Sequence, residues 1–551
     1  MAKTALIPLG LLLAVVLGSI AALLARLDVA TVAGILTDPE IRFAIAMSMG
    51  TAVTSLLLAV CIAVPAAWAL ARGAIPGGRL LPRLANLALD LPMVTPPLVT
   101  GMGLLLLLGQ TGPVGAAFPA LARNLFSPLG VIIAQTYVAC AILVRSAASA
   151  LSAVDREYVH AAHGLGLSPW KAFVLVEIPL CWRPLTGGCI LALSRALGEF
   201  GATLMLAGAT RMKTETLPMA VFLNIASGDF TKAIACAALL IVIACALLLA
   251  LHAVQGRDRA TDGAGNGDAG GQPEQSHMHE YGVPRGESRS AIVIRNARRL
   301  AQRLPSLAAG GIPNTAPTRP HGAHADDTAP AVTSPAEAQS HADGQSPLLR
   351  LADISGGLLR DVSLDIPEGA CLGVGGPSGS GKTTLLRIIA GTLAHGGRVE
   401  YAGRDITGLP PWRRPFRRLD QRLYLFPYLT VDGNLRLAQY AAGQPDDPAR
   451  RAEVLARMGI AHLAHRLPRQ ISGGEQQRAA LARAVVGAPR LLLLDEPFSS
   501  LDWELRERLW EVLRNIRAAY GVTMLLVSHE PRELEALADA RVTLRGGRLA
   551  D

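Results

Sequence analysis

The fold of one half of this chain is decided by the stretch ACLGVGGPSGSGKTTLLRIIAG, residues 370–391. Its first part, 370–376, is an apolar run typical of a buried strand, and its last part is typical of a helix. Between them, Gly376 to Thr383 has the spacing G-x-x-x-x-G-K-T, which is the phosphate-binding loop in its required place between strand and helix. The sequence therefore predicts an α/β domain that binds a nucleotide.

Each residue type in this loop has a chemical reason to be there. Backbone N–H groups of a glycine-rich turn point inward at phosphate oxygens, and the start of a helix adds partial positive charge. Lys382 is expected to reach the β- and γ-phosphates, and the Thr383 hydroxyl is expected to bind Mg²⁺. The residues predicted to contact ATP are Gly376, Pro377, Ser378, Gly379, Ser380, Gly381, Lys382, Thr383 and Thr384.

A second element, RLLLLDEP at 490–497, has the pattern of a buried strand followed by two acids. Four consecutive leucines suit a strand that is covered on both faces, as in a parallel sheet. Asp495 is expected at the carboxyl end of this strand, where α/β sheets bind ligands, and can hold Mg²⁺ through water. Glu496 beside it is the expected base that polarises the attacking water. A pair of capping acids after a core strand is the alternative.

A third element is ISGGEQQR, residues 471–478. Ser472 is expected to cap the helix that follows, and Gly473 and Gly474 allow close approach of backbone N–H groups to an anion. Taken alone, the segment with its Glu475 is also an ordinary helix start. Two more positions fit the same site, Gln421 in DQRLYLFPYLTV and His529 at the end of TMLLVSH.

The order of these motifs resembles the ATP-binding domain of ABC transporters over about residues 350–551. The resemblance implies that Gln421 is the Q-loop glutamine, which serves catalysis and Mg²⁺, and that His529 is the switch histidine. It implies that Ser472–Glu475 is the signature, which closes on ATP held by a second copy, so that a homodimer is needed. SSLD at 499–502 matches the D-loop. One departure is DISGGLLRD at 353–361, which lacks the aromatic residue that the family stacks on adenine.

Charge is distributed unevenly along the chain. The first 255 residues hold 25 charged side chains, whereas the other 296 residues hold 70. An apolar half is therefore joined to a soluble half, which excludes a single globular domain and a small disulfide scaffold. The net charge of +9 is spread along the sequence and gives little support to a nucleic-acid partner.

The apolar half predicts membrane spans, since a bilayer core needs about 20 apolar residues per helix. There are six candidates, at 5–25, 43–71, 86–109, 129–152, 181–208 and 233–254. The loop after the second candidate carries Arg72, Arg79 and Arg83 without an acid, which predicts that it is cytoplasmic. The N-terminus is then inside, in a multi-pass protein of the cytoplasmic membrane. A cleaved signal peptide is the alternative for the first segment.

The segment 256–345 is rich in Gly, Pro, Ala, Ser, Asp and His and is predicted to be a disordered linker. The predicted domains are a permease at 1–255, this linker, and an ATP-binding domain at 346–551 on the cytoplasmic side.

The loop HAAHGLGLSPWKAFVLVEIPL at 160–180 resembles the EAA loop of ABC importer permeases. Ala161, Ala162 and Gly166 match that pattern, and His160 replaces the usual acid. The resemblance implies a short helix that lodges on the ATPase and transmits its closure to the spans. A generic interfacial loop is the alternative.

The segments SRALGEFGATLMLAG at 194–208 and LPMVTPPLVTGMGLLLLLGQTGP at 91–113 resemble the molybdate/tungstate permeases, which are close to sulfate permeases. This implies an oxyanion substrate and an external substrate-binding protein. Arg195 and Glu199 are one helical turn apart and are expected to pair, either for packing or for substrate contact.

Together these patterns predict a multi-domain chain, with an α-helical transmembrane domain of about six spans followed by an α/β P-loop ATPase domain. The predicted function is ATP hydrolysis that drives import of an oxyanion, with molybdate the first choice and sulfate or tungstate the alternatives. An ABC exporter and a membrane ATPase without transport are the rival classes.

Overall fold

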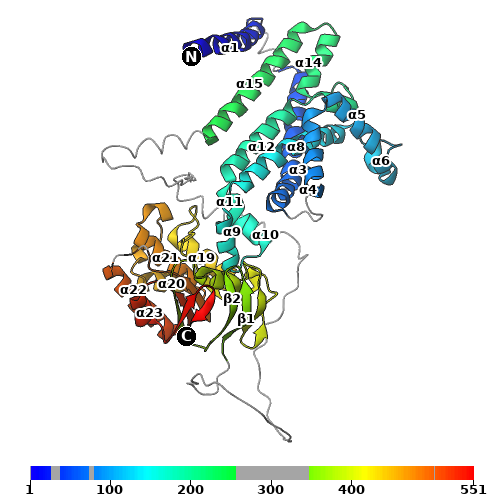
Figure 1. Ribbon diagram of the computed structural model, residues 1–551. Helices are drawn as coiled ribbons and strands as arrows, with labels where there is room; N and C mark the ends of the chain where they lie inside the picture. Colours follow the sequence, from blue (N-terminus) through cyan, green and yellow to red (C-terminus); the bar gives the residue numbers. More distant parts are fainter. Residues whose placement is uncertain are drawn as a thin grey trace. The chain divides into compact units, whose positions relative to one another are not determined.

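The computed structural model describes residues 2–26, 37–73, 80–255, 347–499, 501 and 503–550. The predicted linker at 256–345, and Ser500 and Asp502 of the predicted D-loop, lie outside the described residues. The described residues form two compact units (Figure 1). One contains the residues up to 155 together with 177–255, and the other contains 156–176 together with 347–550.

The first unit is helical throughout its described residues. Its long helices are α1 (Ala2–Leu24), α3 (Pro39–Arg72), α8 (Pro128–Ser152), α12 (Trp182–Leu197) and α15 (Phe230–Gln255). Its shorter helices are α4 (Leu80–Val94), α5 (Pro97–Leu108), α6 (Pro113–Ala117), α7 (Pro119–Arg123), α11 (Ile178–Leu180), α13 (Gly201–Ala207) and α14 (Leu217–Ala226).

Helices α3 and α8 form the centre of this unit, and α12 packs on both of them. The residues buried along α3 are mostly small, including Ala44, Ala52, Ala59 and Ala63. Small side chains allow helix backbones to approach closely where apolar burial gives little driving force, as in a bilayer. Ser55 adds a polar tie, since its hydroxyl donates to the carbonyl of Ile132 at 3.0 Å.

Four of the described helices are long and apolar enough to cross a membrane, namely Pro39–Arg72, Pro97–Ala117, Pro128–Ser152 and Phe230–Val254. A fifth candidate joins Pro169–Leu180 to Trp182–Leu197. The sequence predicted about six spans, so the helical membrane domain is confirmed with four or five. Two shorter apolar stretches are Gly10–Leu24, which is part of α1, and Leu217–Ala226.

Two predicted spans are broken, and the sequence explains both breaks. The segment 86–109 divides into α4 and α5 at Thr95 and Pro96, because Pro96 and Pro97 lack the N–H groups that would continue the helix. The segment 181–208 divides into α12 and α13 at Gly198. The two broken segments pack against each other, since a Cβ on Gly101 would lie 2.7 Å from the Cα of Ala202.

The second unit contains an α/β domain, as predicted, and the structure shows that this domain has two sheets. A six-stranded sheet has the order β10-β9-β3-β8-β7-β6 and is parallel except for β10. A four-stranded antiparallel sheet has the order β2-β1-β4-β5. The strands are β1 (Leu349–Gly356), β2 (Leu359–Ile366), β3 (Cys371–Gly375), β4 (Gly396–Tyr401), β5 (Arg404–Asp405), β6 (Arg417–Leu419), β7 (Leu491–Asp495), β8 (Thr523–Val527), β9 (Ala540–Arg545) and β10 (Arg548–Ala550).

The helices of this unit are α9 (Arg156–Gly164), α10 (Pro169–Ala172), α18 (Lys382–Ile389), α19 (Val431–Ala441), α20 (Pro448–Arg457), α21 (Gly473–Val485), α22 (Trp503–Tyr520) and α23 (Pro531–Leu537), with a π-helix at Phe173–Glu177 that ends at its boundary. In Figure 1, α20–α23 gather on one side of the unit, and the β1–β2 hairpin lies on the other. The core is apolar, and every residue of β7 is buried. The carboxyl ends of β3, β7 and β8 therefore share one edge, where α/β sheets bind ligands.

Candidate nucleotide site

The glycine-rich loop 376–381 joins β3 to α18, as the sequence predicted. Gly376 has φ 141°, and a Cβ there would lie 2.3 Å from the carbonyl oxygen of Leu544. Only glycine fits this conformation and this close approach. Gly379 and Gly381 also have positive φ, at 78° and 107°. The loop therefore follows a path that exposes backbone N–H groups at the start of α18.

Two side chains in the loop fit a phosphate ligand. The ammonium of Lys382 turns back onto its own loop and donates to the carbonyls of Gly376 at 2.8 Å and Pro377 at 2.9 Å. The hydroxyl of Ser380 is buried and has no hydrogen-bond partner among the described residues. A buried donor without a partner costs free energy, so this hydroxyl suits an acceptor supplied by a ligand.

Thr383 and Asp495 meet where Mg²⁺ is expected. The Thr383 hydroxyl donates to Oδ1 of Asp495 at 3.3 Å, and both groups supply the oxygen ligands that Mg²⁺ prefers. Asp495 ends β7 and is buried, and this burial raises the pKa of its carboxyl group. Arg418, whose guanidinium lies 3.6 Å from Oδ2 of Asp495 and also pairs with Asp420, favours the charged form. The donor set present therefore fits a divalent cation.

Glu496 lies between the two other residues predicted for catalysis. Its Oε2 accepts a hydrogen bond from the side-chain amide of Gln421 at 3.0 Å, and its Oε1 lies 3.2 Å from Nδ1 of His529. Its backbone N–H donates to the carbonyl of Val527, so the loop after β7 is tied to the end of β8. Glu496 also has φ 47°, a left-handed conformation that is rare for this residue type and is concentrated at functional sites.

The predicted helix start at Ser472 is confirmed. The Ser472 hydroxyl accepts from the N–H of Glu475 at 3.4 Å, and the Glu475 carboxylate accepts from the N–H of Ser472 at 2.8 Å. This reciprocal capping box begins α21, and the backbone N–H of Ser472 lowers the pKa of the Glu475 carboxyl. Gly473 and Gly474 form the first turn. Ser472 and Gly473, the first residues of the predicted signature segment, are exposed.

Two structural residues of the site, Arg414 and Arg483, have no local sequence signal. Arg414 is buried and donates to the carbonyls of Leu409 and Thr407 and to the last carbonyls of α18, which fixes the helix that follows the phosphate loop. Burial lowers the pKa of Arg414 to about 10. Arg483 in α21 donates to the carbonyls of Leu423 and Tyr424, and burial lowers its pKa to about 10 as well.

Leu358 stands beside the phosphate loop at the turn between β1 and β2. The side chain is 56% exposed, and a Cβ on Gly381 would lie 3.6 Å from its Cβ. This exposed leucine occupies the stretch 353–361 in which the sequence shows no aromatic residue for adenine.

The segment predicted as a coupling loop packs against the α/β domain in the same unit. The ring of Tyr158 in α9 lies 5.6 Å from Tyr424, edge to face, and 6.4 Å from Phe426. Ala161 and Ala162 are buried on this helix. Gly166 has φ 96°, and a Cβ there would lie 3.0 Å from the carbonyl of Ala441, so both its conformation and its space require glycine.

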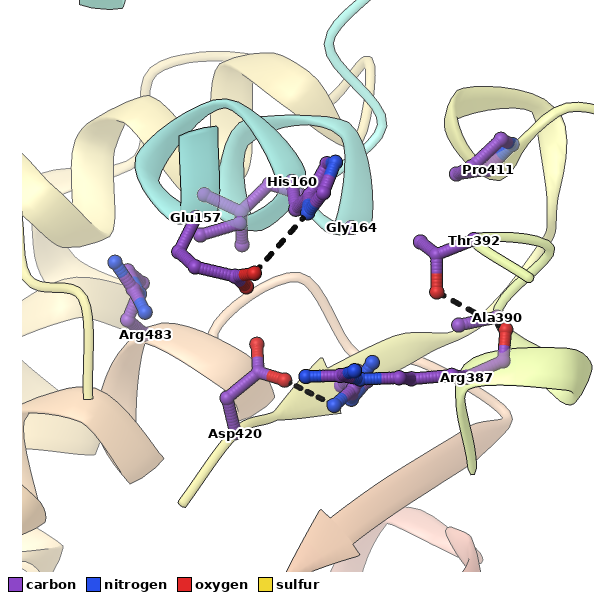
Figure 2. A pocket seen from close by; sticks show the side chains of 12 residues that line it. Glu157, His160, Gly164, Arg387, Ala390, Thr392, Pro411, Asp420 and Arg483 are labelled. Carbon is purple, nitrogen blue, oxygen red and sulfur yellow. Dashed lines mark hydrogen bonds and ion pairs between the residues drawn. The ribbon is translucent and has the colours of Figure 1, made fainter. Parts of the chain in front are cut away.

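A charged pocket lies beneath α9, as Figure 2 shows. Glu157 and His160 point into it from the helix, with 3.6 Å between the Glu157 carboxylate and His160 Nδ1. Asp420, Arg387 and Arg483 face them from the α/β domain. The resemblance expects an acid at position 160, where this chain has His160. Glu157, one helical turn earlier and on the same face, supplies a carboxylate next to that position.

In the helical unit, the predicted pair of Arg195 and Glu199 forms. Arg195 Nη1 lies 2.8 Å from Oε2 of Glu199, and Oε1 of Glu199 accepts from the N–H of Ala202 at the start of α13. Glu199 is buried, whereas 41% of the Arg195 side chain is exposed. A shallow pocket beside the pair is lined by Pro96, Pro97, Leu98, Arg195, Gly198, Glu199, Phe200 and Gly201.

Comparisons with known proteins agree with this division. Residues 359–499 match the family model described as ABC transporter, and residues 63–259 match the model described as binding-protein-dependent transport system inner membrane component. The two matches do not overlap, and neither alone covers half of the chain.

Curated relatives resemble the ATP-binding half. The chain is 44% identical over 194 residues to a molybdate/tungstate import ATP-binding protein of Pyrococcus horikoshii, covering 35% of this chain and 56% of that protein. An Fe(3+) ions import ATP-binding protein of Streptomyces coelicolor is 45% identical over 196 residues, with the same two coverages, 35% and 56%. A spermidine/putrescine import ATP-binding protein of Rubrobacter xylanophilus is 41% identical over 194 residues, covering 35% and 52%.

The chain spans about half the length of these curated relatives. These relatives are named for different substrates but are similarly identical to this chain, so its ATP-binding half resembles importer ATPases of several substrates equally. The chain therefore combines, in one polypeptide, a domain of the binding-protein-dependent inner membrane component family with an ABC transporter ATP-binding domain.

Proposed function

We propose that this chain is the fused permease and ATPase subunit of an importer that uses ATP hydrolysis to move an oxyanion, molybdate, across the cytoplasmic membrane. The observation that carries the proposal is the meeting of Gln421, Glu496 and His529 beside the phosphate-type loop, in a chain whose other half matches an importer membrane component. In this scheme, residues 1–255 are the permease, 256–345 the linker and 346–551 the cytoplasmic ATPase domain.

The phosphates of ATP would be held by Gly376–Thr384, with Lys382 leaving the carbonyls of its own loop to reach them. Thr383, Asp495 and Gln421 would hold Mg²⁺, which when bound offsets charge between the phosphates. Glu496 would accept a proton from the attacking water, and His529 would orient the transferred γ-phosphoryl group. These roles agree with the short distances from Thr383 to Asp495 and from Glu496 to Gln421 and His529.

Two copies of the chain would complete the site. One chain carries a single signature, Ser472–Glu475, whose capping box exposes the first N–H groups of α21. In the family pattern this segment closes on nucleotide held by the other copy, so a homodimer follows. Nucleotide clamped between two copies would supply the free energy that moves the membrane domain. Roughly 5.5 kcal/mol of differential binding shifts a gate from 1:99 to 99:1.

The segment with Ala161, Ala162 and Gly166 would carry this closure to the spans. Its contacts through Tyr158 to Tyr424 and Phe426 place it next to the segment that contains Gln421. Closure would then open the permease outward, where an external substrate-binding protein delivers the anion.

Molybdate is proposed because 91–113 and 194–208 resemble molybdate/tungstate permeases and because one similar ATPase is named for those ions. Sulfate and tungstate are the alternatives within the same chemistry. Fe(3+) and spermidine/putrescine, named for the two other relatives, are cationic alternatives. The loop at 160–180 favours an importer over an exporter, and the membrane half favours transport over a membrane ATPase that moves no solute.

The test is uptake of radiolabelled molybdate by proteoliposomes that hold the full chain and its neighbouring binding protein. We expect ATP-dependent uptake that excess tungstate suppresses and that spermidine or Fe(3+) leaves unchanged. Glu496→Gln should abolish turnover and uptake while it keeps ATP binding. Failure of tungstate to compete would contradict the molybdate assignment, and wild-type turnover in Glu496→Gln would contradict the assigned base.

A further inference from the structure

His529 depends on its backbone turn for its position. About 60% of its side chain is exposed, yet its Nδ1 lies 3.2 Å from Oε1 of Glu496. An exposed ring has few packing neighbours, so the turn that carries it has to set its place. That turn is closed by Ser528, whose hydroxyl accepts from the N–H of Glu530 at 3.0 Å and donates to Oε2 of Glu533 at 2.5 Å.

Glu533 is a buried carboxylate beneath this turn. Only 4% of its side chain is exposed, and burial raises the pKa of its carboxyl group. A buried carboxylate costs free energy unless hydrogen-bond donors and an opposite charge surround it. Glu533 has both, since Ser528 donates to one oxygen and Arg506 Nη1 lies 3.5 Å from the other. The fold therefore places an arginine and a carboxyl group together at this buried position.

Arg506 contacts a second loop at the same time. It lies in the first turns of α22, and its Nε donates to the carbonyl of Leu501 at 2.9 Å. Leu501 ends the loop that begins at Glu496, which is folded by hydrogen bonds from Ser499 to the Glu496 carbonyl at 3.3 Å and from Leu501 to the Phe498 carbonyl at 3.1 Å. One rigid guanidinium therefore contacts both the loop after Glu496 and the carboxylate under His529.

We propose that Arg506 and Glu533 are positioning residues for ATP hydrolysis, which hold the loops of Glu496 and His529 at the separation where these side chains meet. The inference rests on the proposed ATPase function. Arg506 acts through His529 and contacts neither of the groups expected to touch nucleotide. Because Leu501 belongs to the segment predicted as the D-loop, the same guanidinium makes the position of His529 depend on that segment.

The first test measures kcat and KM for MgATP in the full chain reconstituted in lipid, with binding of a fluorescent ATP analogue measured in parallel. For Arg506→Ala we expect kcat to fall roughly 10- to 100-fold, because a displacement of about 1 Å costs this much. KM and analogue binding should stay within about twofold, since the phosphate loop is untouched. Arg506→Lys should recover part of kcat, because an ammonium can keep one of the two contacts. Arg514→Ala, an exposed arginine on the same helix, is the matched control and should keep wild-type kcat.

The second test is a double-mutant cycle with His529→Ala. If Arg506 acts through His529, Arg506→Ala should lower kcat by less than about twofold in the His529→Ala background. A merely structural role would lower kcat by the same factor in both backgrounds. Ser528→Ala removes a single hydroxyl and should show the same dependence on His529, which keeps the inference testable if Arg506→Ala fails to fold.

Two results would overturn the inference. One is a kcat for Arg506→Ala within twofold of the wild type, and the other is an effect that persists undiminished without His529. If the wild-type chain itself hydrolyses no ATP, the proposed function fails and this inference falls with it. If the wild type hydrolyses ATP and either of the two results is found, the inference alone fails.

Discussion

Replacing Tyr158 with alanine is expected to separate ATP hydrolysis from transport. The Tyr158 ring meets Tyr424 edge to face at 5.6 Å and Phe426 at 6.4 Å. Each such aromatic pair contributes about 0.5–1.5 kcal/mol beyond the burial of its area. Losing both pairs removes about 1–3 kcal/mol. This is roughly a 5- to 140-fold change in the equilibrium constant for packing of α9 against Tyr424 and Phe426.

The assay compares ATP turnover with and without the loaded binding protein in proteoliposomes, together with substrate uptake. Tyr158→Ala should keep basal turnover within about twofold and lose at least about fivefold of the uptake per ATP hydrolysed. Tyr158→Phe keeps the ring and is the matched control, so it should retain most of the coupling. The reasoning is refuted if Tyr158→Ala couples as well as the wild type, or if Tyr158→Phe loses as much as alanine does.

Three further substitutions test the nucleotide site. Leu358→Ala should raise KM for ATP about fivefold by removing about 1 kcal/mol of apolar contact, and Leu358→Trp should lower KM by stacking; equal KM values in both variants would contradict this. Arg414→Met leaves several buried carbonyls without a donor, at about 1–3 kcal/mol each, so the melting temperature should fall by several degrees, and an unchanged value would contradict the assigned contacts. Ser472→Ala removes a helix cap that contributes about 1 kcal/mol, and it should lower turnover at least about fivefold. Ser472→Thr keeps the hydroxyl and should keep most of the activity. Similar losses of turnover in both variants would count against the capping role.

The local geometry of the candidate nucleotide site could be predicted because its signals are local. The loop at 376–383 needs glycine at fixed steps between a strand and a helix, and both elements lie where the sequence placed them. Asp495 ends an apolar run whose length and composition fit a buried strand. Ser472 precedes Glu475 at the spacing of a capping box, and the structure contains that box.

The contacts that hold the site together could not be predicted in the same way. Arg414, Arg483 and Arg506 each bind carbonyl groups or a carboxylate brought near by the tertiary fold, and no periodicity marks which arginine is buried. Leu358 lies in the stretch 353–361, where the resemblance to ABC ATPases leads one to expect an aromatic residue that stacks on adenine. The contacts of these residues join groups that are far apart in the sequence. A single sequence shows no local pattern that marks such contacts.

The helical character of the membrane half was predicted from the sequence, and four or five of the described helices qualify as spans. Apolar length identified the long helices α3, α8 and α15, because a bilayer sets that length. The segments 86–109 and 181–208 are also apolar, but each contains a break that shortens its helices. Pro96 and Pro97 mark the first break in the sequence, whereas the second, at Gly198, depends on Glu199 capping a new helix through the N–H of Ala202.

The position of Glu496 has a consequence for the basal rate of ATP hydrolysis. Both of its carboxylate oxygens are engaged within the chain, one by Gln421 and the other by His529. A carboxylate that already accepts these contacts has fewer lone pairs available to accept a proton from a nearby water. The arrangement therefore lowers the basal rate of hydrolysis. We expect Glu496 to act as a base only after Gln421 and His529 move away from it, so a chain in which both contacts persist should hydrolyse little ATP.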